Sequence, residues 1–264
     1  MKRIIFTVLF LAAIASVSLA GELRFSVGVR ETNAVGLIGS NGGTANGIEW
    51  VGRTGGTGED IDLVPADNAW HQISVDFTTD PIGAFAGATA NGILTSTTGF
   101  AALEHLRIAN TADGRTHYKV YIDDVTNTVN GVPTLVTGFE TFAPGVEALF
   151  QEPGFSGSTS AKLKLPPAVP GAPNIARVTS AVAFSGTQSY EVEFDFLDDT
   201  AAGVGGAGNW VRLTTFNTVN LPNAAIGING SLSMQVRIVS IPEPASLLLF
   251  GIAAMAAVGI ARRR

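Results

Sequence analysis

The sequence predicts an all-β protein made of jelly-roll-like sandwiches, with a helix only at each end of the chain. Four short segments alternate apolar and polar residues, which is the period of a strand with one face on a core and one in water. Glycine accounts for 31 of the 264 residues and clusters in turn-like intervals between such segments. Between the two ends, no segment keeps the apolar spacing of a long helix. Many short strands joined by glycine-rich turns are typical of sandwiches and jelly rolls.

The alternating segments define the expected strands. In the first, Ile73, Val75 and Phe77 share one face, and polar residues occupy the other. Three further segments follow the same rule, at residues 118–123, 190–196 and 232–238. Each is expected to place its apolar side chains on a core and its polar side chains in water.

The body divides near residues 130–133, where the sequence reads Asn-Gly-Val-Pro. This predicts two tandem sandwiches, residues 21–130 and 134–240, each of about 110 residues, which is a common domain size. A single larger sandwich is the alternative, because all-β domains can exceed about 200 residues. Only two or three strands fit between Trp210 and Ser240, so the first half is expected to complete the edge of the second.

Residues 1–20 read as a signal peptide. Met1-Lys2-Arg3 is basic, an apolar segment follows, and Ser18-Leu19-Ala20 supplies the small residues that signal peptidase requires. We expect export through the Sec translocon and cleavage between Ala20 and Gly21. An uncleaved anchor is the alternative, and the small residues disfavour it.

The C-terminal residues 241–264 have three parts: Pro242-Glu243-Pro244, an apolar helix over 247–261, and Arg262-Arg263-Arg264. The prolines fix φ and lack N–H groups, so the first part is expected to be extended. The arginines are costly to move across a bilayer and are expected to remain cytoplasmic. At ~1.5 Å per residue the helix reaches ~23 Å, short of a ~30 Å hydrocarbon core. This length favours a processed inner-membrane anchor over a permanent one.

These three parts, in this order, resemble the PEP-CTERM sorting signal of exported proteins in Gram-negative bacteria. The resemblance implies recognition by exosortase, a membrane-embedded cysteine transpeptidase. Pro242, Glu243 and Pro244 would then mark the cleavage region, and Arg262, Arg263 and Arg264 the basic stop. It also implies a transient stay in the inner membrane, followed by a cell-surface or extracellular location.

The body resembles, more loosely, jelly-roll domains of the galactose-binding and carbohydrate-binding type. The resemblance rests on the strand Tyr121–Val125, on Phe139-Glu140, and on the Trp-led segment from Ala69 to Phe77. It implies a structural Ca²⁺ held by Asp123, Asp124 and Glu140, since calcium prefers several oxygen ligands. Trp50, Trp70 and Trp210 are also candidates for stacking on a sugar, and Trp70 is the one in the strand that carries the resemblance. Solvated strand ends and a core tryptophan are the alternatives.

Composition limits the remaining choices. Residues 21–241 hold 11 Lys and Arg against 21 Asp and Glu, a net charge of −10, which disfavours nucleic acid as a partner. The absence of cysteine excludes disulfides and thiol chemistry. The three histidines lack the spacing of a zinc site; we expect His71 and His117 at strand starts and His105 in a turn.

These observations predict a non-enzymatic exported protein of the cell surface or extracellular matrix, with no catalytic residue and no cofactor beyond the calcium. One alternative is a carbohydrate-binding module for exopolysaccharide or another glycan. A second alternative is a polysaccharide-acting hydrolase, which requires two carboxylates about 5 to 10 Å apart in a cleft.

Overall fold

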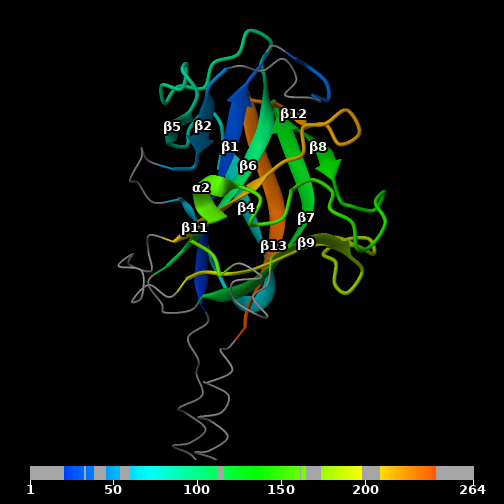
Figure 1. The fold of residues 1–264 in the computed structure, drawn as a ribbon. Coiled ribbons are helices and arrows are strands. Elements are labelled where there is room, and N and C mark those ends of the chain that lie inside the picture. Colours follow the sequence, from blue (N-terminus) through cyan, green and yellow to red (C-terminus); the bar gives the residue numbers. More distant parts are fainter. Residues whose placement is uncertain are drawn as a thin grey trace, which may run out of the picture.

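The protein is nearly all β in the computed structural model (Figure 1). The structure describes residues 21–32, 34–38, 46–53, 60–111, 116–160, 162–164, 174–197 and 209–241. The one helix among them is the single turn α2 (Gly157–Ser160). The predicted signal peptide at 1–20 and the predicted sorting tail beyond Ile241 lie outside the described residues.

The described strands form two antiparallel sheets. The seven-stranded sheet has the order β11-β6-β1-β2-β5, with β12 also paired to β6 and β3 to β1. Its strands are β1 (Glu22–Glu31), β2 (Ile48–Val51), β3 (Asp62–Pro65), β5 (Ile82–Ala86), β6 (Phe100–Asn110), β11 (Trp210–Thr214) and β12 (Ala225–Gly227).

The six-stranded sheet has the order β4-β13-β7-β10-β9, with β8 paired to β7. Its strands are β4 (Asp67–Asp76), β7 (His117–Val129), β8 (Val132–Thr137), β9 (Asn174–Thr179), β10 (Ser189–Asp195) and β13 (Gly230–Ser240). Strand β13 lies between β4 and β7 and hydrogen-bonds to both.

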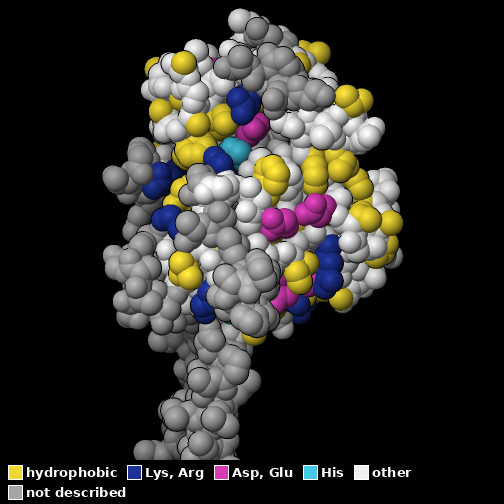
Figure 2. Space-filling view, viewed as in Figure 1, with side chains coloured by type: hydrophobic (Ala, Val, Ile, Leu, Met, Phe, Trp, Pro, Cys, Tyr) yellow, Lys and Arg dark blue, Asp and Glu magenta, His cyan; other side chains and the backbone are white. Residues whose placement is uncertain are grey.

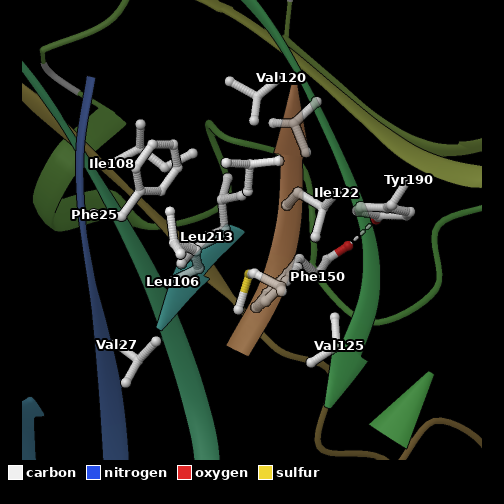
Figure 3. Close-up of a cluster of buried hydrophobic side chains, with 14 of the residues drawn as sticks. Phe25, Val27, Leu106, Ile108, Val120, Ile122, Val125, Phe150, Tyr190 and Leu213 are labelled. Atoms are coloured by element: carbon white, nitrogen blue, oxygen red, sulfur yellow. Dashed lines mark hydrogen bonds between the residues drawn. The ribbon is translucent and has the colours of Figure 1, made fainter. Parts of the chain in front are cut away.

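The core lies between the two sheets (Figure 3). Phe25 and Leu106 point inward from the seven-stranded sheet toward Ile122 of β7, and all three are at most 1% exposed. The buried Tyr190 hydroxyl donates a hydrogen bond to the Phe150 carbonyl oxygen. The predicted alternation is confirmed, since Ile73, Val75 and Phe77 are all buried while their polar neighbours lie outside or are half-buried.

The prediction of two tandem sandwiches is wrong, because strands from both halves of the chain share each sheet. Strands β11 and β12 pair with β6, and β13 pairs with β4 and β7. The predicted boundary is instead a hairpin turn. Asn130 and Gly131 both have positive φ, 50° and 78°, and Val129 pairs with Val132, as in a two-residue type I′ hairpin. The two halves therefore form one sandwich, in which each sheet contains strands of both halves.

The first and last described residues lie at the same end of the sandwich (Figure 1). Gly21 accepts a hydrogen bond from the Ala66 N–H, and Ile241 donates one to the His117 carbonyl at 2.9 Å. Both ends of the described chain are therefore tied into the sheets. Among the described residues, no helix is long and apolar enough to cross a membrane.

Candidate functional site

The junction between the sandwich and the C-terminal tail is sharp. Strand β13 stays paired to its last residues, Val239 opposite Lys119 and Ser240 opposite Tyr118. Directly after Ile241 comes the segment Pro242-Glu243-Pro244. This segment and the terminal Arg262-Arg263-Arg264 lie outside the described residues. The folded part thus ends directly before the predicted recognition segment.

The N-terminal junction is equally close. Strand β1 begins at Glu22, and the preceding Gly21 is buried. Ala20 lies outside the described residues. Cleavage between Ala20 and Gly21 would therefore leave the first strand complete.

Trp70 lies on the outer face of the six-stranded sheet, not in the core. It is half-buried and packs edge-on against Phe184, with 5.8 Å between ring centroids. Phe184 is 49% exposed. Across the sheet, Trp70 shares a row with Arg237, Tyr121, Glu191 and Arg177 on successive strands. The predicted sugar-binding residue is therefore within reach of solvent, beside a second aromatic ring.

Charged side chains on this face form pairs across the strands. Lys119 lies 3.0 Å from Glu191 and 3.2 Å from Glu193, and Arg177 lies 3.3 Å from Glu191. Partial burial tends to lower the pKa of Lys119, but its hydrogen bonds to the two glutamates outweigh this and raise it. Burial also raises the pKa of Tyr121.

The predicted calcium ligands hold a loop. Asp123 accepts hydrogen bonds from the N–H groups of Phe184, at 2.8 Å, and Ser185, at 3.2 Å. Asp124 accepts one from the Ser185 hydroxyl at 2.8 Å. Glu140 accepts bonds from the Thr187 N–H and hydroxyl, both 2.8 Å, and from the Gln188 N–H, 2.9 Å. All three carboxylates thus fix the loop between β9 and β10.

The electrostatics of these carboxylates follow from this role. Burial raises the pKa of Asp123, although three backbone N–H groups oppose the shift. The hydrogen bonds to Thr187 lower the pKa of Glu140. Among the described residues, no group of three or more His, Asp or Glu side chains is placed to hold a metal ion. The structure does not assemble Asp123, Asp124 and Glu140 into the expected calcium site.

The histidines occupy three separate settings. His71 lies within β4 and contacts the Asp67 carboxylate at 2.9 Å. His117 begins β7, as expected, and contacts Glu193 at 2.9 Å. The prediction of a turn for His105 is wrong, because this residue lies in the middle of β6 and is buried.

Two cavities, of about 400 and 420 Å³, open between the described elements. The first is mostly apolar, and Glu140, already bound to its loop, is its one charged lining residue. The second is lined by Asn, Ser and Thr side chains together with Glu31. Glu31 accepts bonds from the Thr95 N–H and hydroxyl at 2.8 and 2.6 Å. Neither cavity contains a pair of carboxylates.

The two other tryptophans considered for sugar stacking lie on the outer face of the seven-stranded sheet, apart from Trp70. Trp50 and Trp210 meet there edge to face, with ring centroids 6.2 Å apart. The signal was present in residues 210–213, where Trp210 and Arg212 alternate with Val211 and Leu213. Since the latter two face the core, the former two had to lie on the outside.

Comparison with known protein families decides the nature of the tail. Residues 240–264 match the PEP-CTERM protein-sorting motif. The chain carries a PEP-CTERM sorting signal. The match begins at the last residue of β13, so the sandwich ends where the motif begins. No curated protein and no solved structure matches the chain.

The PEP-CTERM motif identifies an exported, membrane-passing protein that exosortase processes. The resemblance stated for the tail is thereby confirmed. The resemblance of the body to carbohydrate-binding jelly rolls is not confirmed, although the two-sheet all-β architecture is consistent with a sandwich.

Proposed function

We propose that this chain is a non-enzymatic protein of the cell surface or extracellular matrix, delivered there by signal peptidase and exosortase. The observation that carries the proposal is the coincidence of boundaries at Ser240, where β13 ends and the PEP-CTERM match begins. Cleavage near Pro242-Glu243-Pro244 removes no strand residue. The delivered product is then the complete sandwich.

The use of the carboxylates supports a role without catalysis. Asp123, Asp124 and Glu140 accept hydrogen bonds from a loop, which positions that loop. Glu191 and Glu193 are paired with Lys119 across neighbouring strands. These acids stabilise structure and do not converge on a cleft, as a glycoside hydrolase requires.

Mass spectrometry of both termini on protein recovered from the producing cells tests this proposal. We expect a mature N-terminus at Gly21 and a C-terminus close to Pro242–Pro244. A variant with Pro242-Glu243-Pro244 scrambled should keep its C-terminal arginines and stay with the membrane fraction. Recovery of surface protein that still ends in Arg264 would refute exosortase delivery.

A second candidate function, glycan binding by the outer face of the six-stranded sheet, has its own support. Trp70 is half-buried beside the exposed Phe184, and Tyr121 and Arg237 lie in the same row. An aromatic face and nearby polar groups are suited to the C–H and hydroxyl faces of a sugar ring.

The test is a glycan array probed with the protein and with Trp70→Ala. Ile93→Ala, which removes another exposed apolar side chain, is the matched control. We expect Trp70→Ala to lose binding at least tenfold with an unchanged melting temperature, and Ile93→Ala to bind normally. Equal binding by all three proteins would rule out this face.

A further inference from the structure

The outer face of the seven-stranded sheet gathers positive charge from a body that is acidic as a whole. Six of the 11 Lys and Arg in residues 21–241 meet in connected contacts on this face: Arg24, Arg30, Arg53, Arg107, Lys162 and Arg212. We call this set the basic face. Figure 2 shows Lys and Arg side chains on the left of the view, where β11 lies in Figure 1.

Acids offset part of this charge. Asp60 pairs with Arg107 at 2.9 Å and lies 3.8 Å from Arg53, and Glu104 pairs with Arg30 at 2.9 Å. Glu22 lies on the same face of β1 as Arg24, so among the described residues six cations meet three anions here, whereas the body has a net charge of −10. This asymmetry is the first indication of an anionic partner.

Aromatic rings lie among these cations. Trp50 contacts Phe85, with centroids 4.6 Å apart, and the Arg107 guanidinium lies 4.2 Å from the Trp210 ring. The Arg212 guanidinium lies 5.0 Å from the Phe85 ring. Phe85, Trp210 and Arg212 are each half-buried, so their edges are reachable from solvent. Guanidinium groups held on aromatic faces are pre-organised to bind planar anions.

His105 lies beneath these rings. Its ring lies 5.8 Å from both Trp50 and Phe85, it is 3% exposed, and neither ring nitrogen has a hydrogen-bond partner among the described residues. A buried polar group without a partner is costly. Because both nitrogens are covered from solvent, a partner can reach them only when neighbouring side chains move.

We propose that the basic face binds an acidic polysaccharide, a chain of sugar rings that carry carboxylates. Carboxylates form bidentate hydrogen bonds with guanidinium groups, and the sugar C–H faces pack on aromatic rings. The cations extend over β1, β6 and β11, so the face suits a polymer with repeated charges. Duplex nucleic acid is disfavoured, because it carries one negative charge about every 1.7 Å, and so dense a charge is repelled by the rest of this acidic body.

The experiment uses the full chain in a neutral detergent and measures binding to alginate, with dextran as the uncharged comparison. The test variant is Lys162→Gln/Arg212→Gln. The matched control is Lys119→Gln/Lys164→Gln, which removes the same charge from two lysines that pair with Glu191 and Asp195 of the six-stranded sheet. We expect the test variant to bind alginate roughly tenfold more weakly and the control to change by less than twofold. The affinity for alginate should also depend less steeply on salt concentration in the test variant alone.

Melting temperatures of all variants identify any that fail to fold. Should the double variant unfold, Lys162→Gln alone serves, since the lysine is half-buried beside Trp210. Equal losses in test and control variants, equal binding of dextran, or tighter binding of duplex DNA than of alginate would overturn the proposal. Because these measurements do not involve Pro242–Pro244, their failure would leave the sorting proposal intact.

Discussion

The outer faces of the two sheets carry the same kinds of residue in different settings. On the six-stranded sheet, Glu191 is shared by Lys119 and Arg177, whose side chains are 25% and 45% exposed. On the seven-stranded sheet, Arg107 and Asp60 are only 7% and 2% exposed. Where water can hydrate the charge that remains after its partner is lost, the ion pair contributes little to the free energy of folding. Where the remaining charge is buried, losing the partner strongly destabilises the fold. The two faces therefore offer similar chemistry with very different energetic consequences.

The largest loss of stability is expected when the buried ion pair between Asp60 and Arg107 is broken. Asp60→Ala removes the acceptor of the Arg107 guanidinium and of the Ser26 hydroxyl. Burial already lowers the pKa of Arg107 to about 10, with Asp60 opposing the shift. We expect the free energy of unfolding to fall by about 3 kcal/mol in urea denaturation.

The corresponding change on the six-stranded sheet is Glu191→Ala. Its cationic partners are exposed enough to be hydrated, so we expect a loss of about 1 kcal/mol or less. Similar losses for Asp60→Ala and Glu191→Ala would show that burial does not distinguish the two faces.

A pH dependence sharpens the comparison at His105. Burial, helped by the charges of Arg212 and Arg30, lowers the pKa of His105 well below its usual 6.5. The folded state therefore disfavours a proton that the unfolded chain takes up, and stability should fall as the pH drops below about 6.5. In His105→Leu, urea denaturation between pH 7 and 5 should show a smaller loss.

Gln72→Leu, on the opposite sheet, is the control for that measurement, because it removes no titratable group. We expect it to keep the wild-type slope of stability between pH 7 and 5. An unchanged slope in His105→Leu would mean that another group causes the acid sensitivity.

A small stabilising effect is expected at Asp62, on β3 where the two sheets meet. Burial raises the pKa of its carboxyl to about 6, and the Ser74 N–H bond at 3.0 Å opposes the shift. The carboxyl thus favours folding while protonated, and this contribution is lost as the pH rises through about 6. Asp62→Asn should stabilise the protein by about 1 kcal/mol at pH 7, after allowance for its partial exposure, and by nothing at pH 4.

Thermal denaturation at the two pH values tests this expectation. Asp76→Asn provides a contrast, because hydrogen bonds from Thr78 lower the pKa of Asp76 and should reverse the sign. A gain for Asp62→Asn that is equal at both pH values would contradict the role of ionisation.

Much of the fold could be predicted from the alternation of side chains. Val120, Ile122 and Val236 face the core as a period of two requires. The error concerned Asn130 and Gly131, read as a linker although Asn-Gly is the preferred type I′ turn. Periodicity specifies which face of a strand is buried but not which distant strand lies beside it, so the exchange of strands between the halves could not be foreseen.

The candidate site was predictable only in part. The tail could be read directly, because its signal is a linear segment. Trp70 was a candidate for sugar binding and lies half-buried on an outer face, whereas Asp123, Asp124 and Glu140 were given a role that their loop contacts do not support. The basic face could not be predicted, because its members, such as Arg30 and Arg212, lie far apart in sequence and meet only in the folded chain.

The central position of β13 determines how the protein bears mechanical load. If the body is held by its C-terminal end, the drag of moving fluid pulls on the chain along the direction of β13. Because this strand hydrogen-bonds to β4 on one side and β7 on the other, pulling on Ile241 shears two ladders together. An edge strand would instead peel away from a single neighbour. The sandwich therefore resists extraction at its point of attachment without a single covalent cross-link.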